Sequence, residues 1–141
     1  MIDRPMACFV SHTTVDTHDA YALSEWWKQL LGYEDLPDDP NLPEHPECMI
    51  QSPDGGHRIL FLTNPDTKTV KNRIHLDLRP RERTRAEEVA WALSIGARMV
   101  EDHSDHYGPG VGWVVLADPE DNEFCILRSV AEYEATKELS G

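Results

Sequence analysis

The chain has 141 residues, of which 40% are hydrophobic and 28% are charged, as is typical of one soluble globular domain or of two small halves that share a core. Its formal net charge of −13 repels phosphate backbones and argues against nucleic acid as a partner. The apolar runs are far shorter than the roughly 20 residues of a membrane span, and residues 1–5 lack the basic start of a secretory signal.

The number and spacing of the cysteines indicate the cellular compartment of the protein. Cys8, Cys48 and Cys125 are few, odd in number and widely spaced. This pattern is typical of reduced thiols rather than of a disulfide framework, so the sequence predicts a cytoplasmic protein.

The first half of the chain predicts a strand, a helix and a hairpin. Residues 7–15 are rich in Phe, Val and Thr and predict a strand. Asp19 is a candidate N-cap for a helix over residues 20–31, which Gly32 ends. Residues 34–46 contain four prolines and predict a loop. Residues 47–51 and 57–62 predict two strands joined by a tight turn.

The second half predicts the same order of elements. After a strand over residues 71–78 come a helix over 86–95, a strand over 97–101 and a glycine-rich loop. Strands over 112–116 and 123–127 follow, and residues 130–139 predict a terminal helix or a frayed tail.

The strand over residues 71–78 carries polar side chains at every second position. Because side chains alternate between the two faces of a strand, Arg73, His75 and Asp77 are expected on one face, and Ile74 with its apolar partners on the other. Such a polar face is either solvated or lines a binding cleft.

The two halves are related as an internal repeat. Placing His12 on His75 brings Gly32 next to Gly96, and it also aligns the turns at 52–56 and 118–122. Each copy predicts a βαβββ module, and one copy is too small to bury a large core alone. The two modules are therefore expected to pair.

These motifs resemble the vicinal oxygen chelate (VOC) superfamily and, within it, the glyoxalase-like proteins. The resemblance runs from about residue 8 to residue 128, and its matching segments are His12 with Asp19, residues 26–32, residues 72–78, Gly96 with Ala97, and residues 112–124.

The resemblance implies an α+β fold, in which two paired βαβββ modules form a curved, cup-like mixed sheet with helices outside. The chain is expected to be a single domain, with module one at about 7–63, module two at about 72–128 and a tail at 129–141. The resemblance also implies a small-molecule ligand and a homodimer.

In many family members a divalent metal lies in the cup. The matching positions in this chain are His12, His75 and Cys125, where the family usually has a glutamate at the last. Two imidazoles and a thiolate suit zinc, iron or a similar transition metal. Cysteine is also a common buried packing residue, so the alternative is that His12 and His75 are hydrogen-bonded residues of a metal-free cleft.

Arg73, Asp77 and Trp113 are the candidate substrate contacts. Arg73 suits a carboxylate or an enolate oxygen, or else forms a salt bridge with Asp77. Trp113 suits a flat ligand, or else packs in the core. Two functions follow: a metal-dependent lyase or isomerase in which His12 or His75 moves a proton, or a metal-free protein that sequesters a drug or metabolite.

Overall fold

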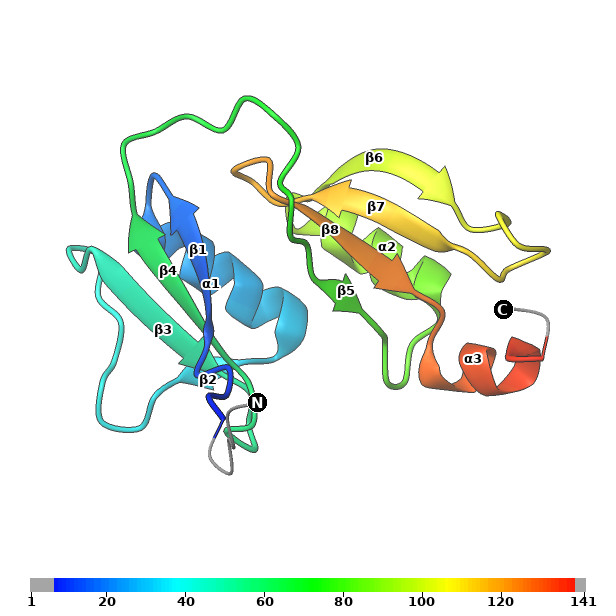
Figure 1. The fold of residues 1–141 in the computed structure, drawn as a ribbon, viewed down its shortest axis with the longest axis horizontal. Coiled ribbons are helices and arrows are strands. Elements are labelled where there is room, and N and C mark those ends of the chain that lie inside the picture. The colour runs from blue at the N-terminus through cyan, green and yellow to red at the C-terminus, as the bar shows by residue number, and fades with distance from the viewer. Residues whose placement is uncertain (1–6, 139–141) are drawn as a thin grey trace, which may run out of the picture. The chain divides into compact units, whose positions relative to one another are not determined.

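The computed structural model describes residues 7–138 and has eight strands and three helices in that part of the chain. It divides into two compact units, Met1–Asp66 and Thr67–Gly141, and each unit is described by itself. Each contains one four-stranded sheet with a helix along one face (Figure 1).

Unit 1 is the first βαβββ module. Its elements are β1 (Thr13–Thr17), α1 (Ala20–Leu31), β2 (Glu34–Asp35), β3 (Glu47–Gln51) and β4 (Arg58–Thr63). The sheet order is β1-β4-β3-β2, in which β1 pairs with β4 in parallel and the other pairs are antiparallel. The predicted loop at 34–46 therefore begins with a short strand.

Helix α1 begins and ends where the sequence predicted. The Asp19 side chain accepts a hydrogen bond from the Ala22 amide, and Gly32 ends the helix at φ 68°. A positive φ costs glycine little. Trp26 and Trp27 are buried and meet edge to face at 5.4 Å between ring centroids, so the helix contributes two aromatic rings to the core of unit 1.

Unit 2 repeats the plan. Its elements are β5 (Asp77–Leu78), α2 (Arg85–Ser94), β6 (Arg98–His103), β7 (Trp113–Ala117), β8 (Glu123–Leu127) and α3 (Val130–Thr136). The sheet order is β5-β8-β7-β6, again with the first pair parallel. The predicted α+β class with two βαβββ modules is confirmed.

Helix α2 is only partly buried. Val89 and Ala92 face the sheet, but Leu93 and Trp91 are exposed. Arg83 instead lies over the Trp91 ring, 5.3 Å from its centroid. The helix begins one residue early because Thr84 forms a capping box with Glu87, which satisfies two backbone amides at once.

Alternating burial divides the unit 2 sheet into two faces. Val114, Leu116, Phe124 and Ile126 are buried on the face that packs against α2. Trp113, Val115, Cys125 and Leu127 alternate with them and so lie on the face opposite α2. Among the residues that the structure describes, no helix is long and apolar enough to cross a bilayer.

Candidate functional site

The segment leading into β5 is less regular than the sequence predicted. Only Asp77 and Leu78 form a strand, while Arg73 and Ile74 lie in a bend. The prediction of one extended strand from residue 71 is therefore wrong. Ile74 is 82% exposed rather than packed. The pairing with β8 starts at Leu76, whose carbonyl accepts the Cys125 amide at 3.0 Å.

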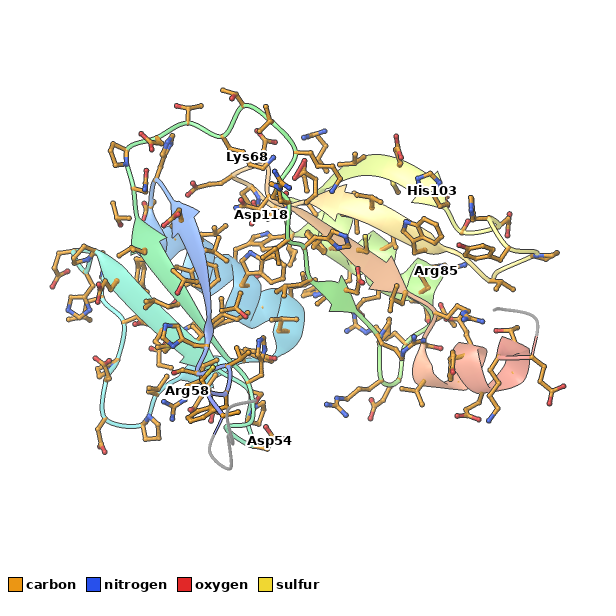
Figure 2. The ribbon with its side chains drawn as sticks, in the orientation of Figure 1. Asp54, Arg58, Lys68, Arg85, His103 and Asp118 are labelled. Atoms are coloured by element: carbon orange, nitrogen blue, oxygen red, sulfur yellow. The ribbon has the colours of Figure 1, made fainter. Side chains whose placement is uncertain are left out.

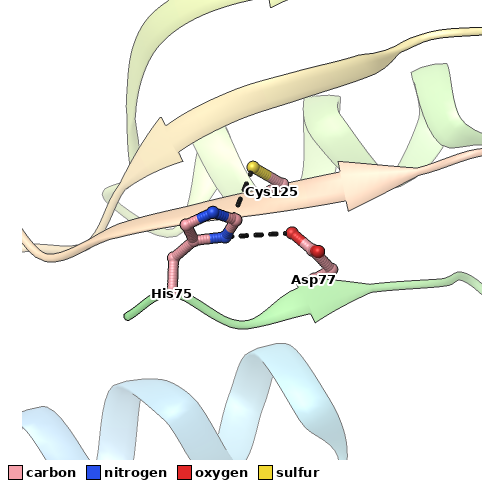
Figure 3. Close-up of side chains that lie close together, drawn as sticks. All are labelled: His75, Asp77 and Cys125. Carbon is pink, nitrogen blue, oxygen red and sulfur yellow. Dashed lines mark hydrogen bonds and ion pairs between the residues drawn. The ribbon is translucent and has the colours of Figure 1, made fainter. Parts of the chain in front are cut away.

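Three potential ligand residues meet where β5 pairs with β8 (Figure 3). Asp77 lies directly opposite Cys125 in the parallel register. His75 precedes the strand by two residues, and its Nδ1 lies 3.0 Å from Asp77 Oδ1 and 3.9 Å from Cys125 Sγ. One ligand atom from each residue lies within 4.8 Å of the other two. We call His75, Asp77 and Cys125 the HDC cluster.

The HDC cluster combines an accessible imidazole and carboxylate with a buried thiol. The side chains of His75 and Asp77 are 37% and 50% exposed, whereas Cys125 is 6% exposed. Burial, together with the Asp77 carboxylate beside it, raises the pKa of the Cys125 thiol to about 11. Without a cation the sulfur therefore stays protonated at neutral pH.

The donor set and its spacing fit a transition metal. Ligand atoms that share one zinc or iron ion at about 2.0–2.3 Å lie roughly 3–4 Å from each other. The imidazole-to-carboxylate and imidazole-to-thiol distances of 3.0 and 3.9 Å fall in this range. A mixed nitrogen, oxygen and sulfur set suits zinc or iron better than magnesium.

The other predicted site residues lie in different surroundings. His12 is half-buried in unit 1, and its Nδ1 lies 3.0 Å from Ser11 Oγ; its role as a metal ligand stays a prediction. Arg73 is exposed in the bend before His75, so its substrate contact also stays a prediction. Asp77, predicted as a substrate contact, lies in the HDC cluster instead of pairing with Arg73.

Trp113 stands at the start of β7 among other rings. Its centroid lies 5.0 Å from that of His103, 5.1 Å from that of His106 and 6.0 Å from that of Tyr107. These neighbours come from β6 and from the loop at 104–112. The half-buried indole thus belongs to an aromatic group on the face opposite α2, rather than to the core.

Arg85 holds the base of that loop. Its guanidinium is 7% exposed and donates to the Gly112 carbonyl at 2.7 Å and to the Ser104 carbonyl at 3.5 Å. Figure 2 shows Arg85 and His103 in the same part of unit 2. The Gly112 amide also donates to the Ser104 carbonyl at 2.7 Å, so the loop is closed at both ends.

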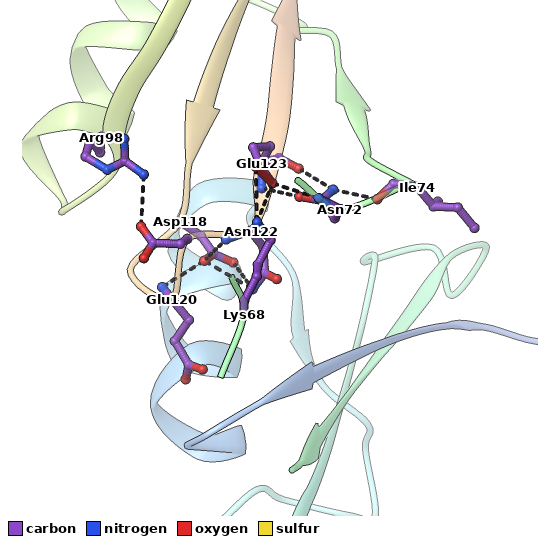
Figure 4. Close-up of polar contacts among 9 residues, drawn as sticks. Lys68, Asn72, Ile74, Arg98, Asp118, Glu120, Asn122 and Glu123 are labelled. Carbon is purple, nitrogen blue, oxygen red and sulfur yellow. Dashed lines mark hydrogen bonds and ion pairs between the residues drawn. The ribbon is translucent and has the colours of Figure 1, made fainter. Parts of the chain in front are cut away.

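A polar network fixes the segment before His75 (Figure 4). Glu123 accepts from Lys68 Nζ, at 2.9 Å for the closer oxygen, and from the Asn72 amide at 3.3 Å. The Asn72 side chain also accepts the Glu123 amide at 2.8 Å. Glu123 lies two residues before Cys125 and shares its face, but its carboxylate is engaged in these contacts.

The sequence did not single out Asp77 as a potential metal ligand. The sequence contained a signal for this role, because Asp77 stands two residues after His75 and is therefore expected on the same face of a strand. It was overlooked because the metal positions that the resemblance implies are His12, His75 and Cys125 and do not include Asp77.

Comparison with known proteins agrees with the fold. A family model described as a glyoxalase-like domain matches residues 12–127. A search of curated proteins found no significant match.

Several solved structures are similar in fold. A glyoxalase/bleomycin resistance protein/dioxygenase family enzyme from Burkholderia phytofirmans PsJN is 22% identical over 82% of this chain and 94% of its own, with a TM-score of 0.61. The fosfomycin resistance protein FosX from Listeria monocytogenes, as a mutant complexed with Mn(II) and 1S,2S-dihydroxypropylphosphonic acid, is 12% identical over 96% and 100% of the two chains, with a TM-score of 0.64. Oxidase ChaP-H2 is 20% identical over 87% and 94%, with a TM-score of 0.57.

Proposed function

We propose that this chain, which belongs to the glyoxalase-like domain family, is a metal-dependent enzyme of lyase or isomerase type that acts on a small oxygenated metabolite. The observation that carries the proposal is the HDC cluster, in which His75, Asp77 and Cys125 place three ligand atoms within 4.8 Å of one another. FosX, which shares the fold, was crystallised with Mn(II), and this supports a metal in the present chain.

The residues of the cluster would hold the ion with one nitrogen, one oxygen and one sulfur atom. A bound divalent metal supplies Lewis-acid polarisation of a carbonyl or hydroxyl oxygen. His75 Nδ1 and Asp77 Oδ1, which lie 3.0 Å apart, are the nitrogen and the oxygen that would share the ion. The exposure of the imidazole gives a small substrate access to it.

The substrate's reacting carbon would lie near the ion held by the cluster, and His75 would act as a ligand of that ion rather than as the base that moves the proton. Arg73, predicted to bind a carboxylate or an enolate, is the candidate to complete this site, and the role of His12 as a further ligand or base stays a prediction. A homodimer in the cytoplasm is the expected form of the protein.

A metal-free binding protein is the second candidate, and one observation favours it. Cys125 is 6% exposed and stands where the family usually has a glutamate. A neutral, buried thiol packs well without any ion. In this case the His75–Asp77 pair would hydrogen-bond a sequestered drug or metabolite.

Metal analysis separates the two candidates. The protein is purified without chelator and its zinc, iron and manganese contents are measured, together with those of His75→Ala and Cys125→Ala. The enzyme proposal expects about one equivalent of a transition metal, lost in both variants. His106→Ala is the matched control, because it removes an exposed imidazole of the same unit outside the cluster.

A metal-free wild type that also takes up no zinc, iron or manganese on titration would overturn the enzyme proposal. Retention of the metal in both variants would show that the ion lies elsewhere, which contradicts the HDC cluster as its site.

A further inference from the structure

A second feature of unit 2 is a pocket of about 370 Å³ beside α3. This volume lies within the range of small-ligand sites. Leu127 and Val111 contribute apolar surface to its wall. Its remaining chemistry comes from three cations and three aromatic rings, which are Arg79, Arg128, Lys137, Tyr107, Trp113 and Tyr133.

The charge of the lining is opposite to that of the chain. The sequence has 26 acidic residues and 13 lysines and arginines, yet the residues that line the pocket include three cations and no carboxylate. Such a local excess of positive charge favours a negatively charged ligand over a neutral or cationic one.

Arg79 is held in place without a carboxylate. It donates to the Arg128 carbonyl at 2.7 Å and lies over the Tyr133 ring, 4.7 Å from the centroid. In the described part of the chain no acidic oxygen lies within 4.0 Å of its guanidinium. A guanidinium has five N–H donors in a fixed fork, so most of those on Arg79 stay available for a carboxylate.

The rings supply flat walls. Tyr107 and Trp113 lie 6.0 Å apart between centroids with an interplanar angle of 43°. Arg79 and Arg128 both stack on the Tyr133 ring, at 4.7 and 5.1 Å. Flat aromatic surfaces beside a forked cation are suited to a planar organic acid.

The pocket and the HDC cluster share one face of the sheet. Leu127, which lines the pocket, follows Cys125 by two residues on β8, so both side chains point to the face opposite α2, and Arg79 follows Asp77 by two residues, just beyond the end of β5. Two residues along a strand cover roughly 6.6 Å. A ligand of one or two rings in the pocket can therefore extend towards His75.

We infer that this pocket binds the carboxylate end of an aromatic organic acid, with Arg79 as the anchor and Trp113 as a wall. The inference rests on the proposed function in one respect: the other end of the ligand faces the HDC cluster. It names the substrate class as a planar carboxylate.

The test uses 2-naphthoate and its uncharged analogue 2-naphthamide, titrated by calorimetry into the full-length protein after dialysis against EDTA. The wild type should bind the acid at least about 10-fold more tightly than the amide, because a charge-assisted hydrogen bond is lost with the amide. Arg79→Gln should abolish this preference for the acid. Trp113→Leu should lower the affinity for both ligands.

Arg98→Gln is the matched control, because it removes a cation of the same sheet that pairs with Asp121 on the surface and does not line the pocket. Lys137→Gln is a second pocket variant in case Arg79→Gln does not fold. Equal binding of acid and amide by the wild type, or an unchanged preference in both pocket variants, would overturn the inference.

The outcome is separable from that of the metal experiment. Naphthoate binding is measured without metal, and metal uptake is measured on Arg79→Gln without naphthoate. A protein that takes up metal but ignores naphthoate refutes the pocket alone. A protein that binds naphthoate but takes up no metal refutes the enzyme proposal alone.

Discussion

The two units share one plan, but among the residues that the structure describes, potential ligand residues gather in only one of them. In unit 1 the parallel pairing of β1 with β4 places Thr14 opposite Leu60. In unit 2 the same pairing of β5 with β8 places Asp77 opposite Cys125. A hydroxyl and an aliphatic side chain thus stand where the other unit has a carboxylate and a thiol.

The difference follows from which face of each sheet packs on the helix. Ile59 and Phe61 of β4, like Phe124 and Ile126 of β8, are buried on the helix side. These positions determine whether the module folds. The residues between them face the other way, so they can change without loss of the fold, and only one unit has acquired ligand atoms there.

The loops that connect the hairpin strands differ as well. In unit 1 the loop is held by Asn41, whose side chain donates to Asp35 and to the Met49 carbonyl at 2.8 Å each. In unit 2 the anchor is Arg85, which reaches the loop from α2. The loop of unit 2 therefore depends on a contact with the helix.

The largest expected effect is that of Gly112→Ala. A Cβ at Gly112 would lie 1.6 Å from the His103 carbonyl oxygen, a backbone atom. The backbone must move, and we expect the free energy of unfolding to fall by about 3 kcal/mol, measured by urea denaturation.

The control for this substitution comes from unit 1. At Gly56 the nearest atom to a new Cβ is Asp54 Oδ1 at 3.1 Å, the end of a side chain that can rotate. Gly56→Ala should cost less than about 1 kcal/mol. Equal losses in the two variants would contradict the role of Gly112 in closing the loop.

Exchange of residues between the units tests the HDC cluster directly. The double variant Asp77→Thr/Cys125→Leu gives unit 2 the residues of unit 1, and its zinc affinity should fall by at least about 100-fold because two ligands are lost. Zinc competition with a chromogenic chelator measures the change.

The reverse exchange sharpens the comparison. The double variant Thr14→Asp/Leu60→Cys places a carboxylate on β1, two residues after His12, and a thiol opposite it on β4. If strand register alone determines the cluster, this variant takes up a second equivalent of zinc. If it does not, the bend at Arg73 and Ile74, which has no counterpart at residues 10 and 11 of unit 1, is what positions His75.

Removal of the loop anchor is the next prediction. Arg85→Met keeps much of the buried side-chain volume but leaves the Gly112 carbonyl without its guanidinium donor. An unsatisfied buried carbonyl costs about 2 kcal/mol, which urea denaturation would measure. Limited proteolysis should also begin within residues 104–112.

Arg83→Met is the control for the anchor, because Arg83 is exposed and only stacks over Trp91. This substitution should lower the free energy of unfolding by less than about 1 kcal/mol. If Arg83→Met lowered the free energy of unfolding as much as Arg85→Met, the positive charge of an arginine in this unit, rather than the contact of Arg85 with the loop, would be what stabilises it.

Sequence reasoning predicted the order of the repeated elements where local signals agree with burial, but the strand predicted over residues 7–15 is wrong for residues 7–12, since β1 begins at Thr13 and Phe9 and Val10 are exposed. Asp19, Gly32 and the turns at 52–56 and 118–122 have the geometry that their residue types favour. The strand before His75 was predicted too long, since the alternation of residues 71–78 is satisfied by β8 at only two positions. Asn72 bonds instead to Glu123, a contact across 51 residues that no local pattern reveals.

The candidate site was predicted only in part, because contacts between distant residues are not visible in local patterns. His75 and Cys125 were found through the family resemblance, and the structure adds Asp77 to them because it gives the strand register. The pocket residues Arg79 and Tyr133 carry no motif. They meet only because α3 lies beside the end of β8 (Figure 1).

The smallest expected effect concerns Glu123. Its counterpart at the start of β4, Arg58, is exposed and forms no ion pair within the described residues. Burial by itself raises the pKa of Glu123, but the Lys68 ammonium and the Asn72 amide outweigh it and hold the pKa below its usual value. A carboxyl with a lowered folded-state pKa stabilises the protein above its unfolded-state pKa of 4.5, and this contribution is lost as the pH falls through the folded-state value.

Glu123→Gln should therefore lower the free energy of unfolding by about 1 kcal/mol at pH 7, as expected for a partly buried pair. The difference from the wild type should be fully present above pH 4.5 and shrink as the pH falls through the lowered folded-state pKa. Urea denaturation across this range measures it, with Arg58→Gln as the control that shows no such trend. A difference that stays constant with pH would mean that Glu123 acts through its shape and hydrogen bonds alone, and the two strand starts would then differ in packing rather than in charge.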